Sequence, residues 1–450
     1  MKKILLVALN SSWSQSNLAL YYMRQMIRDL ECETRMKTYS LKEPLHQIME
    51  DVYSQKPDVI CFSAYIWNRV MLCSLQAELS KILPQCLFVI GGPEAASFQQ
   101  AQNSYVIIGE GEGKFRALAE SAFDPKSCVQ SPASIHLKDI PFPYTEGDKT
   151  ELEDHLIYFE CYRGCPYACV YCLSANDMRH QPRFELTKAG EMDRLHKELA
   201  LLAELKPRTL KFIDRSFNIQ KDLAHAIWNY AICNDSDFDY HFEIYPDLLD
   251  ETDFDILSKA PAGRIRFEVG IQSTNPDVLW QSGRYTDWEK SRRALLDLKT
   301  RTRIRVHADL ITGLPGEDLA SVIRSLNELC SCEPAAVQLG TLKILPDTPM
   351  MQIAQERQYL WMDMPPYQVL CSDALSFDDL CLLQDYAHLL SLYWNKEEYP
   401  NLWHTLLQKH PADRILSHLK RMHAQKDMPL HSVSKHNREM MMQCLADQLL

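Results

Sequence analysis

Three closely spaced cysteines constrain this chain more than any other feature. Cys165, Cys169 and Cys172 follow a C-x3-C-x2-C spacing, and a tyrosine precedes the last of them. Three thiolates can bind three irons of a cubane iron–sulfur cluster, whereas clusters that only carry electrons are usually closed by four cysteines. The fourth iron is then left open, as one position is left open in a catalytic zinc site. The spacing therefore predicts a [4Fe–4S] cluster with one iron available for chemistry.

The main alternative for these cysteines is a zinc site that borrows Cys161 or His180 as a fourth ligand. Zinc sites more often pair two C-x2-C arms at a distance, and the sequence has no second arm. The cluster is therefore the favoured interpretation. The spacing resembles the signature of the radical S-adenosylmethionine (SAM) superfamily. That resemblance implies that a reduced cluster cleaves SAM to methionine and a 5′-deoxyadenosyl radical, which abstracts hydrogen from an unreactive C–H bond.

Composition indicates a globular enzyme of a reducing compartment. The chain has 450 residues, of which 46% are hydrophobic, and its longest early apolar run is Ile4–Leu9. Such a run is too short for a signal peptide core or a membrane span, so we expect a cytoplasmic protein with no membrane partner. The other cysteines are expected to be reduced and mostly buried thiols. The formal net charge of −12 makes nucleic acid an unexpected partner.

Residues 1–123 predict one α/β domain. Short aliphatic runs alternate with helical patterns, and the expected strands are Ile4–Leu9, Thr34–Tyr39, Val59–Phe62, Leu87–Ile90 and Tyr105–Ile108. The expected helices are Leu18–Leu30, Leu45–Tyr53, Val70–Leu83 and Gly113–Ala122. This order favours a doubly wound, flavodoxin-like parallel sheet, in which ligands bind beyond the carboxyl ends of the strands.

Glycine turns lie at two of those strand ends. Gly91 and Gly92 follow the fourth expected strand, and Gly109 and Gly111 follow the fifth. Placed ahead of the cysteine motif, they resemble the cobalamin-binding domain of the cobalamin-type radical SAM class. The resemblance implies cobalamin as a further cofactor, with these glycines letting the backbone approach it closely. Alternatively, the glycines only make tight turns, and the domain serves as a lid or a docking surface.

One departure concerns the axial ligand of cobalt. Cobalamin domains that supply a lower histidine carry D-x-H-x-x-G after the first strand, but the Asn10–Asn17 loop here has neither histidine nor glycine. His46 is the only histidine in the first 130 residues, and it lacks that motif. Trp13 or another residue of the loop is expected to cover the lower face of the corrinoid instead.

A linker over residues 124–154 is expected to precede a barrel over residues 155–351. Pro141 and Pro143 predict that Ile140–Tyr144 runs extended across the surface. The expected barrel strands are Leu156–Glu160, Leu210–Asp214, Tyr240–Ile244, Ile265–Val269, Ile304–Leu310 and Val337–Leu345. Helical stretches between them suit the partial (β/α)6 barrel that the radical SAM resemblance implies, with chemistry at the carboxyl ends of the strands.

Polar residues and turns follow those strand ends, where they can hold SAM. The candidate contacts are Asp214, Glu243, Glu268, Gln272, Ser273 and Gly313. Acidic groups can bind the ammonium group and the ribose hydroxyls, and the Gly313-Leu-Pro-Gly316 turn resembles the family turn that lies against adenine. Each has a structural alternative, as a helix N-cap or a plain turn. His307 is an even choice between a barrel histidine and a substrate contact.

Residues 352–450 predict a helical region, with apolar repeats over Leu382–Trp394 and Arg414–His423. The whole pattern predicts a radical SAM enzyme with an unidentified substrate, and a bound corrinoid would make methyl transfer the natural outcome. The nearest rival is a porphyrin-directed oxidative decarboxylase. A non-catalytic cluster, zinc or tetrapyrrole-binding protein is the alternative outside the enzymes. An electron donor such as flavodoxin or ferredoxin is the expected partner.

Overall fold

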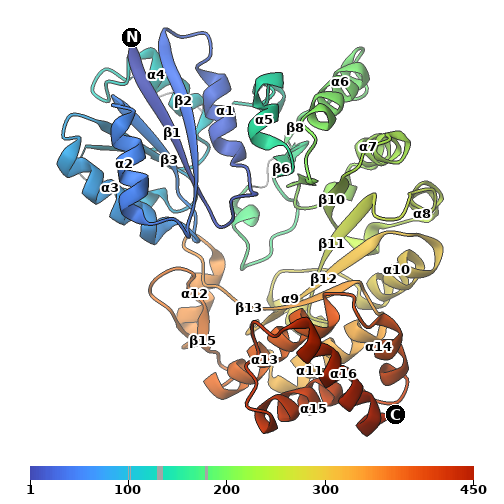
Figure 1. Ribbon diagram of the computed structural model, residues 1–450. Coiled ribbons are helices and arrows are strands. Elements are labelled where there is room, and N and C mark those ends of the chain that lie inside the picture. Colours follow the sequence, from blue (N-terminus) through green and yellow to red (C-terminus); the bar gives the residue numbers. More distant parts are fainter. Residues whose placement is uncertain (100, 102, 129–134, 178–180) are drawn as a thin grey trace. The chain divides into compact units, whose positions relative to one another are not determined.

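The computed structural model describes residues 1–99, 101, 103–128, 135–177 and 181–450 (Figure 1). The chain divides into two compact units. One comprises Met1–Arg163, Gln181–Lys211 and Ser236–Phe238, and the other comprises Gly164–His180, Phe212–Asp235 and Asp239–Leu450. In the part of the chain that is described, no helix is both long and apolar enough to cross a membrane.

The first sheet is parallel and has the strand order β2-β1-β3-β4-β5. Its strands are β1 (Lys2–Asn10), β2 (Cys32–Ser40), β3 (Val59–Ser63), β4 (Leu87–Gly91) and β5 (Ser104–Val106). Its helices are α1 (Leu18–Met26), α2 (Leu45–Ser54), α3 (Arg69–Ile82) and α4 (Glu112–Glu120). The order reverses between β1 and β3, which is where doubly wound sheets bind ligands.

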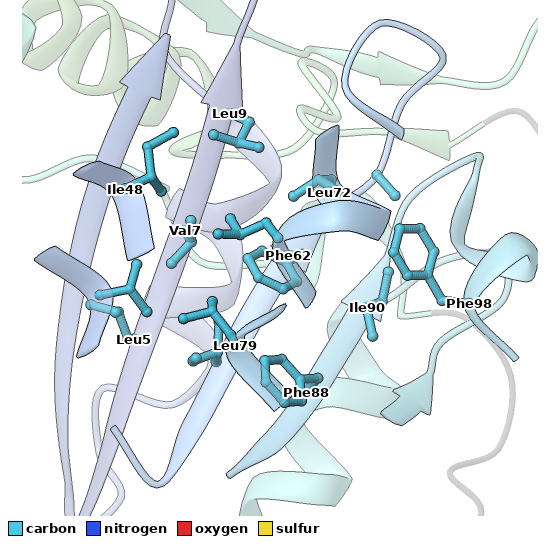
Figure 2. Close-up of a cluster of buried hydrophobic side chains, with 14 of the residues drawn as sticks. Leu5, Val7, Leu9, Ile48, Phe62, Leu72, Leu79, Phe88, Ile90 and Phe98 are labelled. Carbon is cyan, nitrogen blue, oxygen red and sulfur yellow. The ribbon is translucent and has the colours of Figure 1, made fainter. Parts of the chain in front are cut away.

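The core of this sheet explains why β1 lies at its centre. Side chains alternate along a strand, and Leu5, Val7 and Leu9 all belong to one buried cluster with residues of α2 and α3 (Figure 2). Ile4, Leu6 and Ala8 are equally buried but lie outside that cluster, on the face that α1 covers. A strand buried on both faces must be apolar throughout, as the Ile4–Leu9 run is.

The second sheet is parallel, with the order β6-β9-β10-β11-β12-β13. Its strands are β6 (Leu156–Phe159), β9 (Thr209–Phe212), β10 (Asp239–Ile244), β11 (Ile265–Gln272), β12 (Arg305–Thr312) and β13 (Ala336–Thr341). The helices between and after them are α6 (Glu191–Glu204), α7 (Lys221–Cys233), α8 (Glu251–Leu257), α9 (Pro276–Gln281), α10 (Trp288–Arg301) and α11 (Leu319–Ser331). The predicted fold class is therefore confirmed.

The C-terminal region is mostly helical, as expected. It comprises α12 (Pro349–Glu356), α13 (Phe377–Leu389), a π-helical turn (Leu390–Trp394), α14 (Pro400–Leu407), α15 (Ala412–Gln425) and α16 (Lys435–Leu449). A short antiparallel hairpin, β14 (Leu360–Trp361) with β15 (Val369–Cys371), interrupts the helices.

Two local expectations are wrong. Ile140–Tyr144 does not cross the surface: Ile140 and Tyr144 are buried, and the Tyr144 hydroxyl donates to the Tyr158 carbonyl at 2.6 Å. The gain from burying the apolar side chains of Ile140 and Tyr144 decides the course of this segment, and the prolines between them do not prevent it. The strand expected over Val337–Leu345 ends at Thr341, because the chain then turns to meet the β14–β15 hairpin, where Ile344 donates to the Tyr367 carbonyl.

Candidate active site

The three motif cysteines line one cavity. Cys165 and Cys169 are 6% and 4% exposed, and Cys172 is half-buried. Burial is the main cause that raises the pKa of the Cys165 thiol, so the thiolate form needs a positive partner such as iron. The alternative zinc ligand His180 lies outside the described residues, and Cys161 is fully buried and does not line the cavity.

Backbone hydrogen bonds hold the cysteine loop in place. The Val170 amide donates to the Ser282 carbonyl at 3.0 Å, and the Met350 amide donates to the Val170 carbonyl at 2.9 Å. Gly283 presses against the loop, since a Cβ there would lie 2.5 Å from the Ala168 carbonyl oxygen. Its φ of +65° is also in the left-handed region. Both observations require glycine at this position.

The same cavity has a wall of polar residues from three strands. Glu243 lies on β10, Glu268 and Gln272 lie on β11, and Asp309 lies on β12. Glu243 is the register partner of Glu268, and Gly270 is the partner of Asp309, so these side chains share one face of the sheet. Three of the predicted SAM contacts, Glu243, Glu268 and Gln272, are thus brought together with the cysteines.

The other predicted contacts do not line this cavity among the described residues. Asp214 lies two residues beyond β9 and is 2% exposed. The Ser273 hydroxyl donates to Glu317 Oε1 at 2.5 Å. Gly313 has a φ of +91° and lies near Leu342 and Val369. As SAM contacts, these three residues stay predictions.

Arg284 is the most informative residue that sequence analysis missed. Its side chain is 5% exposed and lines the cavity. The guanidinium lies over the Tyr245 ring at 4.5 Å, donates to the Tyr245 hydroxyl at 3.0 Å, and lies 3.9 Å from Cys169 Sγ. Its Nε atom is buried with no hydrogen-bond partner in the described structure. A buried cation with a spare donor, beside three cysteines, suits a carboxylate ligand.

Aromatic stacking fixes the position of Arg284. Tyr167, from the cysteine loop, stacks on Tyr245 with ring centroids 4.1 Å apart, and Tyr245 in turn supports the guanidinium. Asp309 was also missed as a site residue. The only sequence signal for it was its spacing of two from His307, which places both side chains on one face of β12.

A buried polar cluster supports the turn after β11. Glu317 is 1% exposed and accepts from Ser273 and from Ser321, whose oxygens lie 2.5 and 3.3 Å away. Ser325 contacts Ser273 and Thr274 in the same cluster. Desolvation is the main cause that raises the pKa of Glu317 to about 7. No cation pairs with this carboxylate among the described residues.

This raised pKa predicts a pH-dependent stability. Between pH 4.5 and 7 the unfolded chain loses the Glu317 proton while the folded chain keeps it, so ionisation favours unfolding and stability falls as pH rises. Glu317→Gln cannot ionise, so relative to wild type it should gain about 2 kcal/mol of unfolding free energy between pH 5 and pH 8. Denaturant titrations at both pH values measure this, with the exposed Glu289→Gln as the control. Parallel pH profiles for wild type and Glu317→Gln would contradict the assignment.

Glycine turns mark the carboxyl ends of β4 and β5 in the first unit. Gly92 has a φ of +99°, and a Cβ there would lie 2.5 Å from the Ala64 carbonyl oxygen. Gly109 has a φ of +77°, and Gly111 precedes α4. Gly91, at the end of β4, has open space where a Cβ would be. Gly92 is therefore required by the packing of its own domain, whereas Gly91 leaves room for a ligand.

Aromatic side chains lie at the same end of the sheet. Trp13, in the loop after β1, is 63% exposed, with its ring edge to face with His155. Trp67, in the turn after β3, is half exposed and stacks on Tyr65 with ring centroids 4.3 Å apart. His46 points to solvent and pairs with Glu50. Sequence analysis did not single out the Tyr65–Trp67 pair.

Comparisons with known proteins place this geometry in a family. The family model described as the Radical SAM superfamily matches residues 159–329, and the B12 binding domain matches residues 4–119. Residues 159–329 belong to the radical SAM superfamily. The chain also carries a B12-binding domain, and residues 355–428 match a protein family of unknown function, DUF4080. Both predicted assignments are confirmed.

Two curated relatives resemble this radical SAM chain. The cobalamin-dependent radical SAM methyltransferase TokK of Streptomyces tokunonensis is 26% identical over 374 residues, which cover 71% of this chain and 51% of TokK. An oxygen-independent coproporphyrinogen III oxidase of Cereibacter sphaeroides is 32% identical over 116 residues, or 26% of this chain and 25% of that protein. The matches thus span about half, or less, of the length of these relatives.

Solved structures share the fold. The cobalamin-dependent radical enzyme OxsB with aqua-cobalamin bound matches 100% of this chain and 80% of its own, with a TM-score of 0.67 and 14% identity. The radical SAM methyltransferase TsrM from Kitasatospora setae, with tryptophan and a SAM analogue bound, matches 80% of this chain and 77% of its own, with a TM-score of 0.63 and 16% identity.

The matched radical SAM and B12-binding domains imply a [4Fe–4S] cluster, SAM and cobalamin as cofactors. The residues present fit the first two. Cys165, Cys169 and Cys172 line one cavity and would supply the thiolates for three irons of the cluster. Gln272 Oε1, like Arg284 Nε, is buried without a partner in the described structure, so the cavity wall keeps an acceptor and a donor available for SAM. No three His, Cys, Asp or Glu side chains in the described ranges are grouped for one metal ion, but each thiolate of such a cluster binds a different iron.

Proposed function

We propose that this chain is a cobalamin-dependent methyltransferase that acts on an unactivated carbon. The observation that carries the proposal is the combination of two features in one chain. One is a B12-binding domain with no histidine in its first loop, and the other is a cysteine-lined cavity with polar residues that can hold SAM. When bound, the cluster and SAM supply a 5′-deoxyadenosyl radical, and cobalamin supplies the methyl group.

The residues of the cavity have separate tasks in this proposal. Arg284 binds the carboxylate of SAM, because it is the buried cation of the cavity and retains a free Nε donor. Glu243, Glu268 and Asp309 are acceptors for the ammonium group and the ribose hydroxyls, and the Gln272 amide adds a neutral acceptor. Tyr167 and Tyr245 stack at the cavity wall and exclude water from it.

Product analysis tests the methyl transfer. Loss of a methyl group from SAM leaves S-adenosylhomocysteine, so the reduced enzyme should form this product only when a corrinoid is bound. A flavodoxin or ferredoxin is the proposed electron donor. Reduced enzyme that forms 5′-deoxyadenosine without corrinoid, and decarboxylates a propionate-bearing porphyrinogen, would replace the proposal by the coproporphyrinogen oxidase-like alternative, which the 32% identity over 116 residues favours.

The first loop predicts the coordination of cobalt. Asn10–Asn17 contains no histidine, and the exposed Trp13 is the residue of this loop that we propose for the lower face of the corrinoid. Electron paramagnetic resonance of the Co(II) form should therefore show no nitrogen superhyperfine splitting from a protein imidazole. Trp13→His serves as the matched variant, since it offers an imidazole at that position. A nitrogen triplet in the wild-type protein that becomes a doublet when the protein, but not the corrinoid, is labelled with 15N would contradict the prediction.

A further inference from the structure

A cavity of about 370 Å³ shares no lining residue with the cysteine cavity. It is lined by residues at the amino ends of β12 and β13, by α10, and by residues of the C-terminal region between Trp394 and Trp403. The chemistry of a barrel lies at the carboxyl ends of its strands, and neither SAM nor the cluster requires this cavity. Its volume is within the range of pockets that bind small molecules.

Two tryptophans give the cavity an aromatic wall. The Trp394 indole donates to the Pro334 carbonyl at 2.9 Å, and the Trp403 indole donates to the Tyr393 carbonyl at 2.9 Å. Because both N–H groups are already bonded within the protein, the rings offer only carbon surface to a ligand. Their centroids are 4.9 Å apart. The ring planes are tilted by 57° to each other, so a planar apolar body can stack on one indole and contact the other at its edge.

Among the charged residues that line the cavity, one cation has no ion-pair partner in the described part of the chain. Lys299 pairs with Glu333 at 3.0 Å, and Arg305 pairs with Glu397. Arg303 is exposed and has no ion-pair or hydrogen-bond partner among the described residues. Cys332 adds no charge, because burial raises the pKa of its thiol to about 11. A ligand with one negative group would complete the pairing.

We propose that this cavity binds a small planar aromatic monoanion. The aromatic body stacks on one of the indoles of Trp394 and Trp403 and contacts the other at its edge, and the negative group pairs with Arg303. The C-terminal region, whose matched family has no assigned function, thereby provides one wall of a ligand site distinct from the cysteine cavity. The proposal is independent of the reaction at the cluster.

A pair of probes separates the aromatic part from the charge. 8-Anilino-1-naphthalenesulfonate carries one negative charge, and N-phenyl-1-naphthylamine is its neutral counterpart. Both are titrated by fluorescence against the full chain with its cluster, with aquacobalamin and SAM at saturating concentration. The anion should bind one saturable site, about two to five times more tightly than the neutral probe, as expected for one exposed ion pair.

Variants of the full chain then assign the site. Arg303→Gln should weaken binding of the anion about two- to fivefold, Arg303→Glu should weaken it further, and both variants should leave the neutral probe unchanged. Ala335→Phe should fill the cavity and abolish binding of both probes, with an unchanged melting temperature as proof of folding. Arg324→Glu, an exposed arginine outside the cavity, is the charge control for Arg303→Glu. Equal affinities of the two probes, or wild-type anion binding by folded Ala335→Phe or Arg303→Glu, would overturn the proposal.

Discussion

Replacing Cys165, Cys169 or Cys172 by alanine is expected to abolish the iron–sulfur cluster. Anaerobic reconstitution of the wild-type chain should give about four irons and four sulfides, and each single variant should lose most of both. The physical reason is that three thiolates are the whole protein ligand set, so one loss leaves two irons without a ligand. Iron and sulfide analysis, together with the visible spectrum, measures the effect.

Cys161→Ala is the matched control for these variants. Cys161 is in the same segment and is fully buried, but it does not line the cavity. It should keep the full cluster, at a modest cost in stability from the lost sulfur packing. If Cys161→Ala were as damaging as the other three, and zinc were the bound metal, the cluster assignment would be wrong.

Arg284→Met is expected to raise the Kd of SAM by roughly a hundredfold. Removing one partner of a buried charge pair costs on the order of 3 kcal/mol, because the carboxylate of SAM is left unpaired. Arg284→Lys should recover only part of the affinity, since an ammonium cannot keep the contacts with Tyr245 and Gly270 together with a carboxylate. Isothermal titration with SAM and the yield of 5′-deoxyadenosine from reduced enzyme measure both effects.

The controls for Arg284 separate SAM binding from folding. Arg292→Met removes an arginine from the exposed side of α10 and should leave SAM affinity unchanged. Cluster content should stay at the wild-type level in Arg284→Met if the variant folds. A fully loaded Arg284→Met protein with wild-type SAM affinity would show that the guanidinium serves the loop and not the cofactor.

The sequence alone was sufficient to locate most strands and to place the three motif cysteines in one loop. Buried strands are recognisable in the sequence as apolar runs such as Ile4–Leu9. The spacing of the three motif cysteines is local, so it can be read from the sequence before the fold is known. Contacts between distant segments are not visible in this way. Arg284 follows a short helix after β11 and has no motif of its own, so only packing against Tyr245 and Cys169 reveals it.

The turn after β11 shows a second reason for partial success. Gln272 and Ser273 were both expected at SAM, but adjacent residues at the end of a strand point to opposite sides. Gln272 accordingly lines the cavity, whereas Ser273 bonds with Glu317. A register shift between Gly270 and Gln272 also adjusts this strand end, and no pattern of single residues predicts it. Alternation could have selected one of the two residues in advance.

The backbone hydrogen bonds that hold the cysteine loop have a consequence for insertion of the iron–sulfur cluster. Val170 donates to the Ser282 carbonyl and accepts from the Met350 amide, so two backbone hydrogen bonds restrain the loop independently of the cysteine side chains. Little conformational entropy then remains to be lost when the metal arrives. We therefore expect the protein to fold before the cluster is inserted. Small metal-binding domains differ, because they fold only when the metal binds. Gly283, which packs against Ala168 of the cysteine loop, is then expected to affect cluster insertion.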